Sequence, residues 1–545
     1  MIIGLLWALL QLPKVQTFAA QKAAKYLSKE LNVPVTLSHL EIDFSNELIL
    51  NNLYIEDLNK DTLLYLSELE VSVSDLDFIE QTVGVSIHLR EFKAKTYVLK
   101  NDSVFNHQFL LDYFSTSDTS AIQSDWEFKL NGIEISNGKY AFNDYNKDQI
   151  AHGVDYFHLL ADSIHLVATE FNFENDTVIF DLQQLALIEQ SGFKLKQLAA
   201  KTKIYPGVFD LEELNIVTGK TNIKGSYAMI ANDFSDYLDY NNKVEMKGDL
   251  RSTVVNIRDL AYFVPPFLGI ENEVFIDGTV EGTVANLRAN DLQLKINGGT
   301  SLKGDFSFRG LPDFENTFIY TELSNLKTSA YALRSIPVPP FEDQKNLNIP
   351  ASFNKLGQIN FNGNFTGYVF DFVAFGSFST ALGNLKTDVL LKQNSIELYE
   401  YSGNLSSTQF QLGQLVEEEQ LGAIALNVSI IGSGFTKEDA DFKTKGVVNY
   451  VEFSEYKYKN VKLNGSFSKE QFTGIASVKD ENIIADFNGN IDLNRVKPVS
   501  VFKLNVSKAK LARLNLFNKE DLLTELSFES EIDLKGASID DLSGT

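Results

Sequence analysis

The sequence predicts a mainly β fold, an elongated trough of long and mostly antiparallel strands that follows an N-terminal helical region. Two observations lead to this prediction. From Val35 onward apolar and polar residues alternate, as at Val83, Val85 and Ile87, and this alternation is typical of half-buried strands. Glycine also recurs in one register of the alternation. A packed sandwich seldom continues one pattern for so long, whereas a one-dimensional stack of strands does.

The composition indicates a folded protein and argues against nucleic-acid binding. The 545 residues include 48 Lys and Arg against 73 Asp and Glu, a formal net charge of -25. The cationic surface that binds phosphate backbones is therefore not expected. Apolar residues make up 44% of the chain, too much for an intrinsically disordered protein. The chain has no cysteine, which excludes disulfides and thiolate chemistry.

The chain begins with an apolar segment, Ile2 to Leu12, which is followed by Lys14 and three further lysines. A membrane span needs roughly 20 residues, so this segment is short for one. We interpret it as the second half of a membrane anchor whose upstream residues precede the given sequence. The alternative is a buried helix of a soluble protein.

The next segment, Val15 to Leu31, is expected to form one amphipathic helix that Pro34 ends. Lysines are expected on the side of this helix opposite to its apolar residues. Those apolar residues are Val15, Phe18, Ala19, Tyr26, Leu27 and Leu31.

Four regions are predicted along the chain: the anchor and helix at 1–32, an N-terminal β region at 33–120, and two parts of the β trough at 121–340 and 341–545. The boundary near 120 rests on the polar run at 115–120. The boundary near 340 rests on a cluster of prolines. Breaks in the alternation predict short helical turns between strands. These breaks lie at 258–263, 331–334 and 509–514.

The most informative motif is apolar, polar, glycine, polar, apolar, first seen at Ile223–Tyr227. Successive side chains of a strand point to opposite faces, so each glycine shares a face with its apolar neighbours. The glycines of this face are Gly225, Gly248, Gly278, Gly282, Gly304, Gly363, Gly367, Gly465 and Gly489. The apolar residues expected to line it are Ile276, Val280, Val284, Leu302, Phe306, Ile359, Phe361, Phe365, Val369, Leu463, Phe467, Phe487 and Ile491.

Glycine within a strand costs roughly 0.5 to 1 kcal/mol relative to alanine, so its recurrence needs a spatial cause. One cause is relief of crowding where a sheet bends or an aromatic ring packs over the glycine, as in any β-sandwich. The other is that glycines allow long strands to curl into a trough with an apolar concave side. Both causes stay open at this point.

The polar residues do not predict an enzyme, a cofactor or a metal site. His158 and His165 are separated by an odd number of positions, so on one regular strand they would face opposite ways. The run Glu417–Glu419 is interpreted as a solvated loop rather than a catalytic carboxylate pair. The sequence contains no phosphate-binding loop, no nucleophile elbow, no HExxH motif and no dinucleotide fingerprint after a strand.

Several segments resemble TamB-like proteins of the AsmA group, as found in Bacteroidota. They are the stretch 61–64 with the alternation that follows it, 101–106, 363–367 and 371–376. The resemblance implies a periplasmic protein held in the inner membrane by one N-terminal helix. It also implies a U-shaped β trough (a β-taco) that carries phospholipid in an apolar groove between the inner and outer membranes. Support of outer-membrane protein assembly, beside a barrel partner of the TamA kind, is implied as well.

Two other functions compete with this one. A structural or adhesive β-solenoid would use the same apolar face as a closed core. An outer-membrane barrel would turn alternating apolar residues toward lipid, although the N-terminal helix and the helical breaks fit it poorly.

Overall fold

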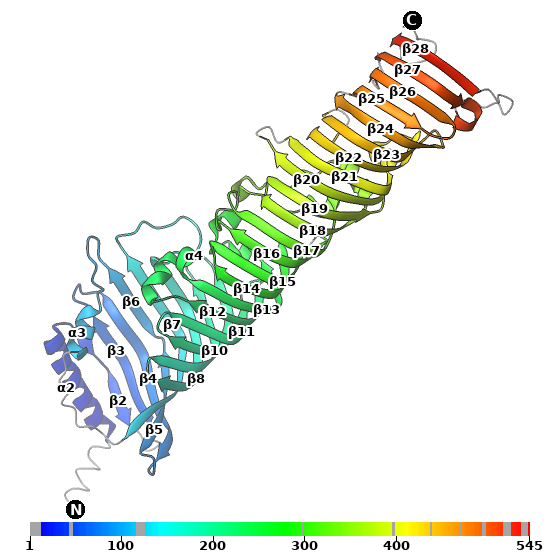
Figure 1. The fold of residues 1–545 in the computed structure, drawn as a ribbon. Coiled ribbons are helices and arrows are strands. Elements are labelled where there is room, and N and C mark those ends of the chain that lie inside the picture. The colour runs from blue at the N-terminus through cyan, green and yellow to red at the C-terminus, as the bar shows by residue number, and fades with distance from the viewer. Residues whose placement is uncertain are drawn as a thin grey trace, which may run out of the picture. The chain divides into compact units, whose positions relative to one another are not determined.

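The computed structural model describes residues 12–42, 47–115, 126–296, 298–394, 398–436, 439–468, 470–492, 498–515, 525–535 and 543–544 (Figure 1). The protein is mainly β, as predicted. The 29 strands of these ranges belong to one sheet, in which nearly all pairs are antiparallel and β7 alone runs parallel to its partners β5 and β6.

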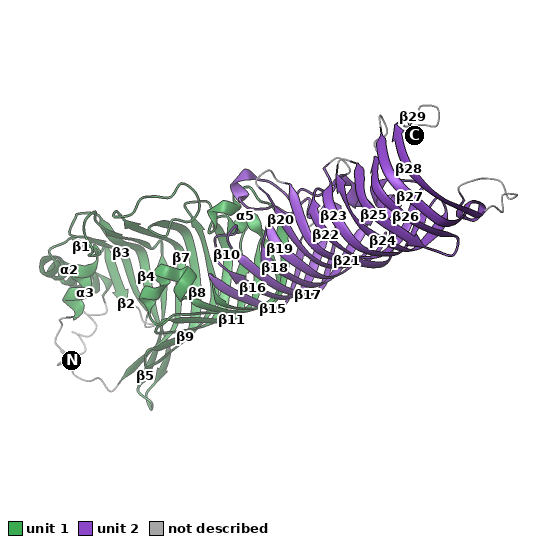
Figure 2. Ribbon diagram, turned by 45° about the horizontal axis from the view of Figure 1, so that its top comes forward, with its two compact units in different colours: residues 1–283 green, residues 284–545 purple. Residues whose placement is uncertain are grey.

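Contacts divide the chain into two compact units, residues 1–283 and 284–545 (Figure 2). The boundaries predicted at 32, 120 and 340 stay predictions. The predicted anchor lies outside the described residues except for Leu12. Of the helices that the structure describes, none has both the length and the apolarity of a membrane span.

Unit 1 contains fourteen of the described strands and its longest helix, α2. Its elements are α2 (Pro13–Leu31), β1 (Val35–Thr36), β2 (His39–Ile42), β3 (Glu47–Glu56), β4 (Thr62–Asp77), β5 (Thr82–Arg90), β6 (Lys93–Val98), α3 (Gln108–Ser115), β7 (Glu127–Asp144), β8 (His158–Glu174), β9 (Thr177–Glu189), β10 (Lys194–Tyr205), β11 (Val208–Val217), β12 (Asn222–Ile230), η1 (Phe234–Asp239), α4 (Tyr240–Lys243), β13 (Glu245–Asn256), α5 (Ile257–Leu260), η2 (Pro265–Phe267) and β14 (Glu273–Thr283).

Unit 2 repeats antiparallel strands of about equal length with short helical insertions. Its elements are β15 (Asn286–Ile296), β16 (Thr300–Arg309), β17 (Phe318–Ser329), α6 (Ala330–Leu333), η3 (Phe341–Asp343), η4 (Ala351–Leu356), β18 (Gln358–Tyr368), β19 (Asp371–Thr380), β20 (Gly383–Gln393), β21 (Tyr399–Gln411), α7 (Leu412–Val416), β22 (Leu421–Ser433), β23 (Asp441–Phe453), β24 (Tyr456–Ser468), β25 (Gln471–Lys479), β26 (Ile483–Asp492), β27 (Val499–Lys510), η5 (Leu511–Leu514), β28 (Glu525–Lys535) and β29 (Ser543–Gly544).

The three predicted breaks in the alternation contain the short helices α5, α6 and η5, which follow strands β13, β17 and β27. Two further insertions of this kind were not predicted: η1 with α4 after β12, and α7 after β21. Polar side chains fix these insertions. In α5, Asp259 accepts hydrogen bonds from the backbone N–H groups of Lys220 (2.8 Å) and Thr221 (2.9 Å). Just after α6, Arg334 donates to the backbone carbonyls of Ile349 (2.8 Å) and Pro350 (2.9 Å).

Helix α2 covers the free edge of the short strands β1 and β2 with side-chain hydrogen bonds. Thr17 Oγ1 donates to the carbonyl of Leu40 (2.9 Å) and accepts from its N–H (3.1 Å). Ser28 does the same for Val35 at 3.0 and 2.6 Å. Unpaired backbone groups at a sheet edge otherwise invite pairing with another chain. The helix therefore ends the sheet on this side.

The orientation of α2 differs from the one predicted. Ala24 and Leu31 are buried, with Leu27 packed beside them, but Phe18 and Tyr26 are 62% and 60% exposed and lie on the same side as the lysines. The prediction was wrong for these two aromatic residues because apolar character was taken as a sign of burial. Within α2 only Ala24 and Leu31 are buried, and Ala19 of the predicted apolar side is exposed as well.

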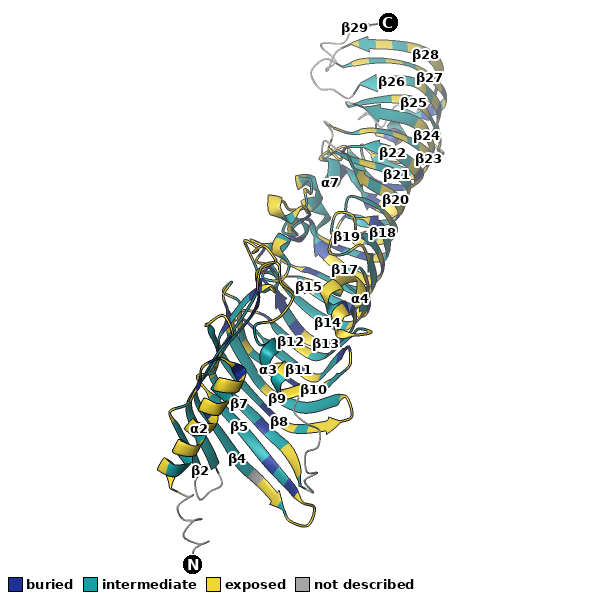
Figure 3. Ribbon diagram, turned by 90° about the vertical axis from the view of Figure 1, so that its left-hand side faces the viewer, coloured by how far each residue is buried: buried dark blue, intermediate teal, exposed yellow. Residues whose placement is uncertain are grey.

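β-Bulges recur along the sheet and interrupt the regular register. In β13 the register shifts between Leu250 and Thr253, and Ser252 within this bulge has a φ of 50°. Comparable shifts occur in β15, β17, β21 and β27. A bulge bends its strand and increases its twist. The strands of unit 2 accordingly arch along their length (Figure 3).

A buried carboxylate fixes the turn between β3 and β4. Asp57 is 1% exposed and accepts hydrogen bonds from Tyr97 Oη (2.6 Å) and Asn106 Nδ2 (2.9 Å). Burial alone raises the pKa of Asp57, but these bonds and those from the backbone N–H groups of Asp61 and Asn59 outweigh it and hold the pKa below its ordinary value. Burial and the bond to Asp57 raise the pKa of Tyr97 to about 12.

We expect this carboxylate to make the stability of unit 1 depend on pH. Because the folded-state pKa of Asp57 is lowered, its stabilising contribution is present above the unfolded pKa of 3.8 and is lost as pH falls through the folded value. Asp57→Asn should remove this acid-sensitive step and destabilise unit 1 by about 1 to 3 kcal/mol at neutral pH. Urea unfolding across the pH range measures both effects.

The exposed Asp148 provides the control, since Asp148→Asn should leave the unfolding curves unchanged. Equal curves for Asp57→Asn and the wild type at all pH values would contradict the assigned role of Asp57.

Candidate functional site: the apolar face of the sheet

The apolar positions of successive strands lie side by side in unit 2. Paired residues of antiparallel strands project their side chains to the same face, so the register defines continuous rows. Row A consists of Leu287, Phe308, Ile319, Gly367, Phe372, Leu391, Tyr401, Gly432, Phe442, Phe467, Phe472 and Ile491. Row B consists of Ala289, Phe306, Thr321, Phe365, Ala374, Val389, Gly403, Ile430, Thr444, Gly465, Gly474, Gly489, Phe502 and Ile532.

Row C follows the next apolar positions toward the margin that carries the helical insertions. It consists of Leu292, Gly304, Leu323, Gly363, Gly376, Thr387, Leu405, Val428, Gly446, Leu463, Ala476, Phe487, Leu504 and Ser530. No residue of rows A, B and C carries a charge. The opposite face of the same strands carries polar residues such as Asn364, Lys445 and Glu531 at positions between row residues, and it also exposes apolar residues such as Phe375 and Ile431.

Unit 1 has equivalent rows from β9 to β14. One of them joins Phe180, Thr202, Leu211, Tyr227, Gly248 and Val280. Tyr237 and Tyr240 of the insertion after β12 cover this part: the Tyr237 ring lies 5.5 Å from that of Phe209, and the hydroxyls of Tyr227 and Tyr240 are 2.9 Å apart.

The aromatic residues of rows A and B in unit 2 are only half-buried. Phe365 and Phe372 stack with ring centroids 4.2 Å apart, and Phe442 stacks on Phe467 at 5.4 Å, yet none of the four belongs to the buried core. Most strand residues in Figure 3 likewise have the colour of intermediate burial. These rings bury one another across strands and leave one side uncovered within the described residues.

The helical insertions cover the margin of the apolar face beyond row C. Leu412 and Leu415 of α7 pack against a buried cluster that includes Phe410 and Val448. Leu514 of η5 is fully buried in a second cluster. The apolar face of unit 2 therefore has a closed margin under the insertions and a part along rows A and B where most side chains are only half-buried.

The surroundings of Tyr401, a residue of row A, show how far this row is removed from water. Its ring stacks on Phe435 with centroids 5.4 Å apart. Removal from water raises the pKa of Tyr401 to about 12, and the negative charges of Asp439 and Asp441 add to this effect. The phenol is consequently neutral at physiological pH and adds no charge to the row.

Two kinds of spatial constraint act at the glycines of this face. Gly363 has a φ of 150°, and a Cβ atom there would lie 2.2 Å from the carbonyl oxygen of Phe375 in the next strand. At Gly248 the backbone is ordinary, and a Cβ atom would instead lie 2.9 Å from Cγ2 of Val280 and 3.3 Å from the ring of Tyr227. The first glycine permits a backbone conformation that L residues rarely adopt. The second makes room for side chains of neighbouring strands.

The structure places the nine predicted glycines and most of the predicted lining residues on this face. The exceptions are Val284 and Val369, which lie in the turns after β14 and β18, because the alternation was extended past the ends of these strands. Ile359 and Phe361 lie on the expected face but are 8% and 5% exposed, so they belong to the covered part.

Sequence reasoning missed other glycines of rows A, B and C. Gly376, Gly432, Gly446 and Gly474 have an apolar residue at an adjacent outward position, such as Phe375 beside Gly376. These glycines do not fit the motif, because the motif requires a polar residue on each side of the glycine. Counting residues in steps of two, without regard to the outward neighbours, would have found them.

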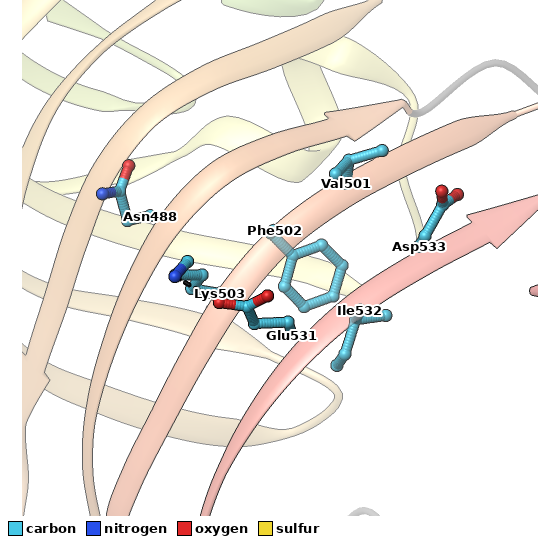
Figure 4. Close-up of a pocket in the computed structure, with 7 residues that line it drawn as sticks. All are labelled: Asn488, Val501, Phe502, Lys503, Glu531, Ile532 and Asp533. Atoms are coloured by element: carbon cyan, nitrogen blue, oxygen red, sulfur yellow. Dashed lines mark ion pairs between the residues drawn. The ribbon is translucent and has the colours of Figure 1, made fainter. Parts of the chain in front are cut away.

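Two hollows lie along the sheet of unit 2, and the smaller of them is lined by residues of row B. One has a volume of 680 Å³ and is lined by Phe361, Phe378 and Leu385 together with asparagine and serine residues. The other, of 420 Å³, lies at β27 and β28, where Phe502 and Ile532 end row B beside the ion pair of Lys503 with Glu531 (Figure 4). Lys503 and Glu531 occupy positions between row residues, so their charges belong to the opposite face of these strands and not to row B.

His158 and His165 lie on β8, but this strand is not regular between them. His158 is buried, and its Nδ1 lies 3.0 Å from a carboxylate oxygen of Asp155. A bulge between Asp162 and His165 interrupts β8, so counting positions does not decide which faces His158 and His165 occupy. Among the described residues no group of three or more histidine and acidic side chains could hold a metal ion.

Comparisons with known proteins identify no family for this chain. No protein-family model matches it, and no curated protein is detectably similar to it.

The close contact at Gly248 gives a test of the packing of this face. Gly248→Ala should destabilise unit 1 by about 1 to 3 kcal/mol, because the new methyl group overlaps Val280. In the double variant with Val280→Ala most of this penalty should disappear, since the methyl group then has space. Chemical denaturation of the two single variants and the double variant measures the coupling.

Gly132→Ala in β7 is the matched control, because its Cβ atom would make ordinary contacts of 3.4 Å or more. Additive effects of the Gly248 and Val280 substitutions would show that the glycine is not required by the neighbouring side chain.

Proposed function

We propose that this protein carries phospholipid along the apolar face of its sheet. The observation that supports the proposal is the continuity of rows A, B and C, which cross unit 2 without a charged residue while the aromatic side chains of rows A and B are only partly buried. Large exposed apolar surfaces on a protein usually mark a site for an apolar ligand or partner.

The physical chemistry of transfer follows from this lining. Each methylene group of an acyl chain costs about 0.8 kcal/mol when exposed to water, so a long chain moving through water meets a barrier of roughly 12 kcal/mol. A continuous apolar surface removes most of this barrier while the polar head group stays in water. The rows offer few polar groups that would hold one lipid tightly, which suits movement along them. No catalytic step is required.

In this proposal the arched strands form a trough with the apolar face on its concave side. The glycines that permit unusual backbone conformations and the recurring bulges favour such bending. The opposing reading is a closed core in a structural or adhesive protein, and the buried clusters beneath α7 and η5 favour it at one margin. The incomplete burial of the rings in rows A and B favours the trough.

The resemblance to TamB-like proteins of the AsmA group adds a cellular setting to the proposal. Such a protein would be held in the inner membrane by one N-terminal helix, would extend into the periplasm and would move phospholipid toward the outer membrane. It would also support assembly of outer-membrane proteins beside a barrel partner of the TamA kind. These parts of the proposal rest on the resemblance alone.

A pair of neighbouring phenylalanines separates the two faces experimentally. Phe365 lies in row B, whereas Phe375 in the adjacent strand points to the polar face and is 61% exposed. An ion beside acyl chains costs several kcal/mol, so Phe365→Glu should lower copurified phospholipid by more than about tenfold. The matched variant Phe375→Glu should retain it. Lipid extraction followed by mass spectrometry measures both.

The stability of the same variants distinguishes an open trough from a closed core. In an open trough the new carboxylate reaches water, and Phe365→Glu stays folded by circular dichroism. In a closed core the charge is buried without a partner and unfolds the unit. An unfolded Phe365→Glu variant would therefore support the structural protein and contradict the conduit.

Photo-crosslinking in living cells tests the proposal without altering charge. A photoreactive residue at position 365 should capture phospholipid, and the same residue at position 375 should not. Failure to capture phospholipid at position 365, with the protein folded and abundant, would overturn the proposed function.

A further inference from the structure

The outward side of α2 has a composition unlike the rest of this acidic chain. Within Pro13–Leu31 there are four lysines and one glutamate, whereas the whole chain has a net charge of -25. On a helical projection the four lysines fall within an arc of about 80°. We name the lysine stripe by these residues: Lys14, Lys22, Lys25 and Lys29.

Two exposed aromatic rings lie in or beside the lysine stripe. Phe18 is 62% exposed, Tyr26 is 60% exposed, and the ammonium group of Lys22 lies 5.4 Å from the centre of the Phe18 ring. Solvated helix faces seldom expose large aromatic rings among charges. Aromatic and basic residues together are typical of a helix that lies in the surface of a membrane.

The rest of unit 1 holds this side of the helix outward. The opposite side is fixed to the sheet edge by Thr17 and Ser28, and Ala24 and Leu31 are buried against β1 and α3. The helix cannot turn its aromatic residues inward without breaking these hydrogen bonds. The exposed face is therefore a property of the folded unit and not of a free helix.

We infer that the lysine stripe with Phe18 and Tyr26 binds the surface of an anionic lipid bilayer, with α2 lying in the plane of the head groups. Charge complementarity selects this partner: the lysines attract anionic head groups, and the rings enter the boundary between head groups and acyl chains. The inference stands apart from the lipid conduit, since α2 contributes nothing to rows A, B and C.

Vesicle flotation of the full chain tests the inference. The wild type should bind vesicles of phosphatidylcholine mixed with phosphatidylglycerol more tightly than vesicles of phosphatidylcholine alone, and added salt should remove the difference. Each lysine changed to glutamine should weaken binding to the anionic vesicles about fivefold. The apolar segment that precedes α2 has no charged side chain, so it should strengthen binding to both kinds of vesicle equally. Its contribution therefore cancels when binding to the anionic vesicles is divided by binding to the phosphatidylcholine vesicles.

Two further variants complete the experiment. Phe18→Ser with Tyr26→Ser should weaken binding to the anionic vesicles while leaving its salt dependence in place. A control with the same loss of charge should keep the wild-type preference. It replaces four exposed lysines elsewhere in unit 1 by glutamine, at Lys100, Lys220, Lys224 and Lys247.

Equal binding of the wild type to both kinds of vesicle would overturn the inference, as would an anionic preference that survives loss of all four stripe lysines. Salt-sensitive binding to heparin without binding to vesicles would point instead to an acidic macromolecule. Lipid crosslinking at position 365 of the purified stripe variant should be unchanged, so failure of this inference is distinguishable from failure of the conduit.

Discussion

A single sheet has two faces, and the described strands of this protein provide no second sheet to cover the apolar one. Most β proteins bury an apolar face against another layer. Here the cross-strand rows place aromatic and aliphatic residues beside one another, so each ring is covered by its neighbours in the sheet. This covering is partial, as the half-buried stack of Phe365 on Phe372 shows. The open side of the rows is the feature from which the proposed function follows.

The margins of the sheet are closed by other means. In unit 2 the insertions α7 and η5 place leucines over one margin of the apolar face. In unit 1 the side chains of α2 satisfy the backbone groups of the edge strand. Asp259 and Arg334 fix two further insertions through hydrogen bonds to backbone groups. These insertions and hydrogen bonds lie at the ends of strands or at an edge of the sheet, and they do not cover the middle of rows A and B.

Much of the fold could be predicted from the sequence because a strand with one apolar face has a period that survives in the sequence. The alternation and the glycine motif located the strands, their common face and three of the helical insertions. The errors arose where the alternation or the helical spacing of apolar residues no longer indicated which residues are buried. Val284 and Val369 continue the alternation into turns. Phe18 and Tyr26 follow the helical period but lie on the solvent side, where apolar character does not report burial.

The extent of the open face could not be predicted, because it depends on register and on what the insertions cover. Ile359 and Phe365 lie on the same face of β18, yet Ile359 is 8% exposed and Phe365 is only half-buried in row B. Their difference comes from distance along β18: Ile359 lies near the margin with the insertions, and Phe365 lies farther from it. The same periodic sequence thus supplies a covered core at one end of a strand and a half-buried apolar surface at the other. The insertions between strands decide where one ends and the other begins.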